Sequence, residues 1–132
     1  MINAIHTALS GLVAASRKAE ASAANIANLQ TAGALTGNPK APYSPVMTTQ
    51  TARAEGGVET SIVAKNTPFV PVYAPDSPFA NEEGLIGIPN VDLAEEAVNL
   101  TLAETAYKAN AKILNTQSEM QKELLRTLDK EV

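Results

Sequence analysis

The segment that decides the fold is Asp92–Leu128, DLAEEAVNLTLAETAYKANAKILNTQSEMQKELLRTL. It contains neither proline nor glycine, and residues with high helix propensity dominate it. Asn90 or Asp92 can cap its N-terminus, and Asp92 and Glu95 have the spacing of a capping box. Acidic residues near the start and basic residues near the end suit the helix dipole. The sequence therefore predicts one long C-terminal helix.

The apolar residues of this predicted helix fall on two stripes roughly 180° apart, at about 100° per residue. The first stripe contains Leu93, Ala97, Leu100, Tyr107, Ala111, Leu114, Leu125 and Leu128. The second contains Val98, Leu102, Ala106, Ala109, Ile113, Met120 and Leu124. A helix on the surface of a globular domain normally has one apolar stripe. Two stripes predict that this helix is covered on both sides.

Residues 3 to about 29 form a second predicted helix, with Asn3 as its N-cap. Apolar or small residues repeat along it in alternating steps of three and four, as in a heptad seam. The seam consists of Ile2, Ile5, Leu9, Leu12, Ser16, Ala19, Ala23 and Ile26. Helices of about 27 and about 37 residues would be roughly 40 Å and 55 Å long. We therefore expect some 15 Å of the C-terminal helix to lack a partner within the chain.

The middle of the chain has a different composition, because all eight prolines lie between Pro39 and Pro89. Helix is excluded from most of this stretch. Two runs rich in β-branched residues, 46–51 and 58–63, flank Gly56-Gly57 and predict a β-hairpin. Residues 68–75 are predicted to be extended, and residues 85–89 lead into the long helix.

These elements predict a mainly α fold, an elongated antiparallel coiled coil of the N- and C-terminal helices with a small Pro/Gly-rich, β-containing central insertion. The corresponding segments are residues 1–30, 31–89 and 90–132. The unpartnered length of the long helix, together with its second stripe, favours a protein that assembles with other chains.

The charge and composition of the chain exclude several function classes. The net charge of −4 argues against a nucleic-acid partner, since phosphate binding needs clustered Lys and Arg. No run of 18 apolar residues is present, so no span of a bilayer is expected. Zero cysteines exclude disulfides and thiolate metal sites. Arg17-Lys18 follow the N-terminal apolar stretch instead of preceding it, so we do not expect a cleaved signal peptide.

Candidate catalytic and metal-binding residues are few. His6 has Thr7 and Ser10 nearby, but the nearest carboxylate in sequence, Glu20, lies on a later turn. Glu82-Glu83 and Glu95-Glu96 are adjacent pairs, and neighbouring side chains point in different directions. The acidic stretch Asp76, Asn81, Glu82 and Glu83 lacks the alternating spacing of a calcium loop. We therefore expect no catalytic site, no metal, no cofactor and no enzyme activity.

The two ends of the chain resemble the bacterial flagellar axial proteins, the family of rod, hook and hook-associated subunits. ANIAN at residues 24–28, followed by Thr31, resembles their N-terminal signature. NVDLAEEAVN at 90–99, with AYKAN at 106–110 and LNT at 114–116, is similar to their C-terminal signature. Within the family, YAPDSPFA at 73–80 is similar to the subunits of the proximal rod. Ala24, Gln30 and the loop 32–41 depart from the usual pattern.

The resemblance implies a structural subunit of the flagellar basal-body rod that polymerises through its terminal helices into the periplasm-spanning drive shaft. It implies as partners other rod subunits, basal-body adaptor and membrane ring proteins, and the flagellar type III export apparatus, which would export the chain without cleavage. One stripe of the long helix would meet the N-terminal helix, and the other would meet neighbouring subunits.

The expected assembly interface consists of Ile5, Leu9, Leu12, Asn25, Ile26, Asn28, Leu100, Leu102, Tyr107, Asn110, Ile113, Leu114 and Leu124. Asn25 and Asn28 are expected either to cap the end of the helix locally or to bond across to another helix.

Two other classes stay open. A non-catalytic coiled-coil adaptor or chaperone would have no need for the proline-rich insertion. A cell-wall hydrolase would need a constellation of carboxylates that the sequence does not present. Another rod or hook subunit of the same axial family is a third alternative.

Overall fold

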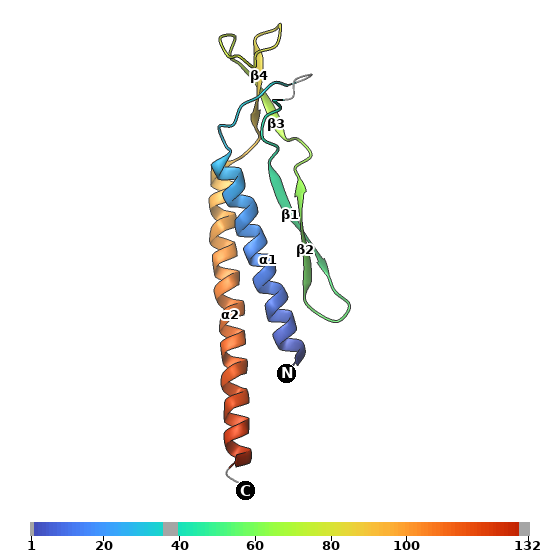
Figure 1. Ribbon diagram of the computed structural model, residues 1–132, viewed down its shortest axis with the longest axis vertical. Helices are drawn as coiled ribbons and strands as arrows, with labels where there is room; N and C mark the ends of the chain where they lie inside the picture. Colours follow the sequence, from blue (N-terminus) through green and yellow to red (C-terminus); the bar gives the residue numbers. More distant parts are fainter. Residues whose placement is uncertain (1, 36–39, 130–132) are drawn as a thin grey trace.

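Helix α1 is the central layer of this elongated molecule. The computed structural model describes residues 2–35 and 40–129. The elements in chain order are α1 (Ile2–Ala27), β1 (Val46–Ala52), β2 (Val58–Ala64), β3 (Phe69–Tyr73), β4 (Leu85–Pro89) and α2 (Leu93–Asp129). α1 packs on α2, which runs antiparallel to it, and on the β1–β2 hairpin (Figure 1). The β3–β4 sheet lies at the end of the molecule where α2 begins (Figure 1).

The buried face of α1 is made of small residues. Ala8, Ala14, Ala15, Ala21 and Ser22 are all buried. Gly11 lies against α2, because a Cβ added there would come within 2.6 Å of Asn110 Oδ1. Small side chains let the backbones of two helices approach closely, since close-packed interiors leave few voids. α1 is therefore thin enough to be covered from two sides by a short chain.

The heptad seam predicted for α1 is wrong. Leu9, which belongs to that seam, is 51% exposed, and Ser16 and Ala23 are also exposed. The buried face lies one residue earlier, where Ala8, Ala15 and Ser22 repeat every seven residues. The alternating three-and-four spacing fits both the predicted seam and the buried face. The smaller side chains are the buried ones because they let the backbones of α2 and the hairpin approach α1 closely. The side chain of Ile2 lies outside what the structure describes.

Asp92 caps the N-terminus of α2, as predicted. Its Oδ1 accepts hydrogen bonds from the backbone N–H groups of Ala94 at 2.8 Å and Glu95 at 3.3 Å. Only this half of the expected capping box is formed, because the Glu95 carboxylate turns to Lys65 Nζ at 3.4 Å instead. The long C-terminal helix predicted from the sequence is confirmed, with 37 residues and no break.

α1 packs between the two apolar stripes of α2, and it does not cover either one fully. The residues of α2 that are buried are Glu96 and Ala103, on a face between the stripes at about 100° per residue. The second stripe is exposed, with Leu102 at 53% and Ile113 at 45%. The first stripe is half-buried at Leu100, Ala111 and Leu114 and exposed at Leu93, Tyr107, Leu125 and Leu128. The expectation that one stripe would meet α1 is wrong, because the polar and small face between the stripes does so.

The end of α2 extends beyond α1, as expected from their lengths. Asn25 bonds to Glu96, and Gly11 lies opposite Asn110. In this antiparallel register, a residue one position earlier in α1 lies opposite a residue one position later in α2. This register places the start of α1 opposite Glu119. The last ten residues of the helix, about 15 Å at 1.5 Å per residue, therefore run past α1 (Figure 1).

The predicted β1–β2 hairpin is confirmed, in the register Val46↔Ala64 to Ala52↔Val58. Its turn contains Gly56 and Gly57 with φ of 92° and 84°, a conformation that side chains other than glycine disfavour. The sequence did not reveal the second pairing, in which β3 and β4 form an antiparallel sheet from Phe69↔Pro89 to Tyr73↔Leu85. On its other edge, β4 exchanges two backbone hydrogen bonds between Gly87 and Gly33, at 2.8 and 3.0 Å.

The predicted fold class, a mainly α antiparallel coiled coil with a small β insertion, is wrong. In the described part of the chain the two helices are accompanied by four strands in two antiparallel two-stranded sheets. α1 is covered by the first of these sheets as well as by α2, so the helices do not form the structure by themselves. The prediction failed because it treated the middle of the chain as an appendage, although the hairpin is one of the layers that bury α1.

Substitution of Gly57 by Ala should destabilise the subunit more than substitution of Gly56. Both glycines have positive φ, so each alanine introduces backbone strain of about 1 kcal/mol. Only at Gly57 would the new Cβ overlap Ser10 Oγ, which accepts a hydrogen bond from the Val58 N–H at 3.1 Å and so attaches the hairpin to α1. We expect Gly57→Ala to lower the free energy of unfolding by about 2 to 3 kcal/mol and Gly56→Ala by about 1 kcal/mol. Urea unfolding followed by circular dichroism measures both, and equal losses would contradict the contact.

Candidate assembly surface

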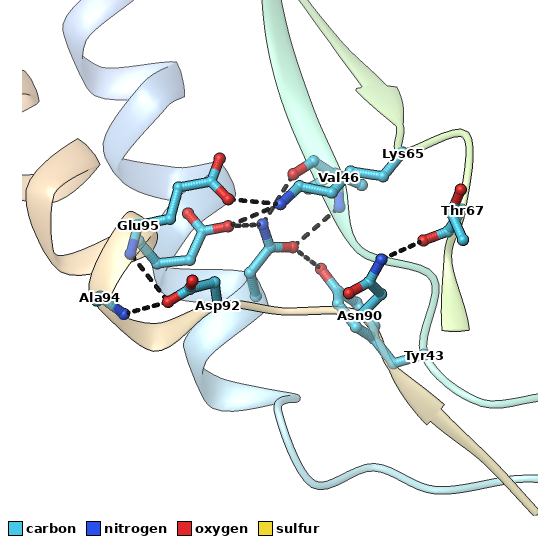
Figure 2. A network of polar contacts seen from close by, with 10 residues as sticks. Tyr43, Val46, Lys65, Thr67, Asn90, Asp92, Ala94 and Glu95 are labelled. Carbon is cyan, nitrogen blue, oxygen red and sulfur yellow. Dashed lines mark hydrogen bonds and ion pairs between the residues drawn. The ribbon is translucent and has the colours of Figure 1, made fainter. Parts of the chain in front are cut away.

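Asn25 is the centre of a polar network that joins α1 to three other parts of the chain. Figure 2 shows this network, with Tyr43, Val46 and Lys65 among its labelled members. Its side chain is fully buried, at 0% exposure. Nδ2 donates to the Val46 carbonyl at 2.8 Å and to Glu96 Oε1 at 2.7 Å. Oδ1 accepts from the Val46 N–H at 2.9 Å and from the Tyr43 hydroxyl at 3.2 Å. All four hydrogen-bonding positions of the amide are thus used, and they connect α1 to β1, to the segment before it and to α2.

Glu96 is a buried carboxylate whose charge is balanced inside the network. Lys65 Nζ, at the end of the hairpin, lies 3.6 Å from Glu96 Oε1 and 3.4 Å from Glu95 Oε2 (Figure 2). A buried charge is costly unless it is paired and hydrogen-bonded, and Asn25 and Lys65 provide both interactions. Burial of the Tyr43 hydroxyl, together with the negative charge of Glu96, raises the pKa of Tyr43 above its usual value. The network therefore fixes how α1, α2 and the hairpin meet.

The sequence did not identify Glu96 as part of this network. Glu95-Glu96 had been explained as acidic residues in the first turn of a helix, and that interpretation holds only for the more exposed Glu95. Glu96 lies on the same face of α2 as Ala103, seven residues later. This spacing was the one indication in the sequence that Glu96 is buried. The Lys65 partner could not be found without the structure, because it is contributed by a distant loop.

The two asparagines of the N-terminal signature both bond within the chain. Asn25 reaches across to α2, as described above. Asn28 Nδ2 donates to the Ala24 carbonyl at 2.9 Å, and its Oδ1 accepts from the Thr31 hydroxyl at 3.3 Å. These contacts of Asn28 are those of a local cap at the end of α1. Both residues are thereby accounted for without a neighbouring subunit.

The other residues of the expected assembly interface are divided between exposed and half-buried positions. Leu9, Leu102, Tyr107, Ile113 and Leu124 are exposed. Ile5, Leu12, Ile26, Leu100, Asn110 and Leu114 are half-buried. Asn110 Nδ2 donates to the Ala106 carbonyl at 2.8 Å and lies over Gly11. The structure thus brings these residues onto the two flanks of the α1–α2 contact and does not gather them into one patch.

Two grooves follow these flanks. The hairpin-side groove has a floor of Gly11, Ala14 and Ala15, with Leu102 and Ala106 on one wall and Gln50 and Val58 on the other. The second, which we call the Tyr107 groove, is an open hollow of about 430 Å³. It is formed by Ala15, Ser16, Ala19, Leu100, Ala103 and Tyr107, with Glu104 and Lys108 also lining it. Such apolar hollows beside exposed leucines are suited to receiving side chains of another helix.

The candidate catalytic and metal-binding residues lie in ordinary structural positions. His6 is exposed on α1, beside a hollow that it shares with Arg53 and Glu55. Asn81 Oδ1 accepts from the N–H groups of Glu83 and Leu85 and so organises a turn. In residues 2–35 and 40–129 we find no group of three or more His, Asp or Glu side chains that could hold a metal ion. Over the same ranges, neither helix is both long and apolar enough to cross a bilayer.

Asn25→Ala should destabilise the isolated subunit far more than Asn28→Ala. The first substitution leaves the buried Glu96 carboxylate and both Val46 backbone groups without their amide partner. We expect a loss of roughly 3 kcal/mol in the free energy of unfolding, against about 1 kcal/mol for the lost cap at Asn28. Urea unfolding of the two variants tests this, with Asn28→Ala as the matched control. Similar losses would mean that the network is not the main constraint.

Alkaline pH should weaken the subunit through Tyr43. Its raised folded-state pKa means that the folded chain holds the phenol proton more tightly than the unfolded chain does. The associated stability is fully present below the unfolded pKa of about 10 and is lost as pH rises through the folded pKa. Unfolding measured from pH 8 to 11 should therefore show a decline that is smaller in Tyr43→Phe. A variant that declines as steeply as the wild type would exclude Tyr43 as the cause.

Comparison with known proteins agrees with the resemblance seen in the sequence. The family model of the flagellar basal body rod FlgEFG protein C-terminal region matches residues 82–127, which include β4 and most of α2. The flagellar basal-body rod protein FlgC of Salmonella typhimurium is 34% identical over 131 residues, covering 97% of this chain and 96% of that protein. FlgC of Escherichia coli O6:H1 is 33% identical over 131 residues, with the same coverage. FlgC of Bacillus subtilis is 34% identical over 82 residues, which cover 59% of this chain and 55% of that protein.

These matches confirm the resemblance to the flagellar rod proteins and give the chain its function. The likeness extends over both helices and the middle of the chain, so it is not confined to the terminal signatures. The chain is a structural subunit of the rod in the flagellar basal body, where its partners are other rod components. On this evidence the chain belongs to the FlgC family of flagellar basal-body rod proteins.

Proposed function

We propose that this rod subunit joins its neighbours through the apolar stripes of α2 and the outer face of α1. The observation that carries the proposal is the position of the large apolar side chains. The hydrophobic core contains mainly alanines, while Leu9 and Val13 on α1 and most large residues of both stripes on α2 are exposed. Rows of large exposed apolar side chains along two helices mark interaction sites more often than single exposed residues do.

The free energy available from these stripes is comparable to the stability of a small domain, about 5 to 15 kcal/mol. Complete burial of a leucine or isoleucine stabilises by about 1.5 to 3 kcal/mol, so burying the exposed half contributes about 1 kcal/mol. The large exposed residues of α2 from Val98 onward are Val98, Leu102, Tyr107, Ile113, Met120, Leu124, Leu125 and Leu128. Together they supply about 8 kcal/mol before the costs of association are subtracted.

The arrangement of segments in the rod follows from the same surfaces. The N-terminal segment 1–30 and the C-terminal segment 90–132 carry the apolar faces, and we place them in the inner helical layer of the rod. The central segment 31–89 holds the two sheets and would lie outside that layer. Its partners would then include the adaptor and membrane ring proteins of the basal body as well as other rod subunits.

The subunit acts mechanically and not as an enzyme, as part of the periplasm-spanning drive shaft. Among the described residues Glu96 is the one buried carboxylate, and its bonds to Asn25 and Lys65 support a structural role for it. Delivery by the flagellar type III export apparatus belongs to the same proposal and is supported by the family to which the chain belongs. No cofactor is required for this role.

Leu102→Glu and Ile113→Glu should prevent assembly without unfolding the subunit. Both side chains are about half exposed in the free chain, so we expect each substitution to lower the free energy of unfolding by only about 1 kcal/mol. In the rod, each carboxylate would be forced into an apolar contact without a partner. The measurements are urea unfolding of the purified variants, the amount of the chain in isolated basal bodies, and swimming in soft agar.

Lys112→Glu is the control for these variants. It places a carboxylate one residue from Ile113 but about 100° around the helix, on the exposed side of α2 that also carries Lys108 and Glu119. We expect this variant to assemble and swim normally. Normal basal bodies with either Leu102→Glu or Ile113→Glu would show that the second stripe stays exposed in the rod, and the proposal would fail.

A further inference from the structure

The end of α2 that extends past α1 carries an apolar ridge, which we define as Leu124, Leu125 and Leu128. These side chains are 48%, 64% and 54% exposed. Gln121, beside them, lies 18 residues after Ala103, which is five full helical turns, so the ridge continues the face that packs on α1. Where α1 is present, that face packs on small residues such as Gly11. Beyond the start of α1, it has no packing partner among the described residues.

The Tyr107 groove has the complementary shape. Ala15, Ser16 and Ala19 of α1 form its low side, and Leu100 and Tyr107 of α2 stand beside them. Among the described residues no strand residue lines it, in contrast to the hairpin-side groove, where Gln50 and Val58 contribute. It is thus an open, mainly apolar hollow of about 430 Å³ whose small residues resemble those that α2 meets inside the subunit.

A chain cannot place its own ridge in its own groove. Both features lie on the same unbroken helix, with Glu104 in the groove and Leu124 in the ridge twenty residues apart. At 1.5 Å per residue this separation is about 30 Å. The ridge can therefore reach a Tyr107 groove only in another molecule.

We propose that the ridge of one copy of this chain docks in the Tyr107 groove of a second copy. The inference rests on the proposed function, and it names the partner of one part of that assembly surface. Charged groups at both surfaces are already paired within the chain, Glu104 with Lys108 at the groove and Arg126 with Glu123 beside the ridge, so apolar contact carries the pairing. Copies joined in this way in parallel orientation are displaced by about 30 Å along the helix axis. A ridge and a groove at different places on one molecule form a heterologous contact, which extends and does not close on itself.

The size of the contact explains why it belongs to the assembled rod. Three half-exposed leucines and the groove bury roughly a few hundred Å², well below the 1,000 Å² or so of a stable pairwise interface. This contact alone would therefore not hold two free chains together, and docking occurs where other rod contacts hold the copies side by side.

Cysteine cross-linking in assembled rods tests the pairing, because the chain has no cysteine of its own. One copy carries Ser16→Cys in the groove, and the other carries Gln121→Cys beside the ridge, which leaves all three leucines intact. Both positions are exposed and polar in the wild type. The two variants are co-expressed in place of the native subunit, swimming is checked, and isolated basal bodies are oxidised and analysed on a non-reducing gel. The control pairs Ser16→Cys with Lys112→Cys, which lies nine residues from Gln121 and therefore on the opposite, charged side of α2.

We expect a disulfide-linked dimer from Ser16→Cys with Gln121→Cys, at least tenfold more abundant than from the control pair. A disulfide requires the two Cα atoms to lie within about 7 Å, so the product reports direct docking. Intact basal bodies that contain both variants but give no dimer, or give as much with the control, would overturn the pairing and leave the proposed function standing. Absence of the wild-type chain from isolated basal bodies would overturn both.

Discussion

The structure depends on the thinness of α1. Because its inward face is limited to alanine, glycine and serine, the backbones of α2 and of the β1–β2 hairpin can both approach it closely. Because these side chains are small, the interior buries little apolar area, since an alanine contributes far less than a leucine. Most of the large apolar residues of both helices are exposed on the outside. If they join neighbouring subunits as we propose, packing within the subunit and assembly between subunits use different faces of the same two helices.

A polar network compensates for the small core by fixing geometry. Asn25 and Glu96 sit where the end of α1, the start of β1 and the start of α2 converge, and Lys65 adds the end of the hairpin. Apolar contacts between alanines tolerate sliding, whereas an amide with all four hydrogen-bonding positions occupied has one satisfactory position. The network therefore sets the register that leaves ten residues of α2 beyond α1. The length of α2 that extends past α1 therefore depends on the position of Asn25 in the sequence.

Local chemistry allowed the elements to be predicted, and long-range contacts explain what was missed. The absence of proline and glycine predicts α2, Asp92 predicts its cap, and Gly56-Gly57 predicts the hairpin turn. The β3–β4 sheet could not be predicted because the pairing of residues 69–73 with 85–89 leaves no local signal. The prediction for α1 named the wrong face because periodicity gives the repeat but not which of two adjacent faces is buried. The prediction assumed that the larger side chains are buried, whereas the buried face consists of small ones. Glu96 was missed because its partners come from α1 and a loop.

Each outward contact that we propose for this subunit would be weak by itself. The apolar stripes alternate with a charged side of α2 that carries Lys108, Lys112, Glu119 and Glu123, and the net charge of −4 keeps free copies apart. A single ridge or groove cannot hold two copies together, since its area is far below that of a stable complex. In the proposed assembly several such contacts would form at once in the rod, and each would raise the effective concentration of the others. Incorporation into the rod would then be favoured over pairing in solution.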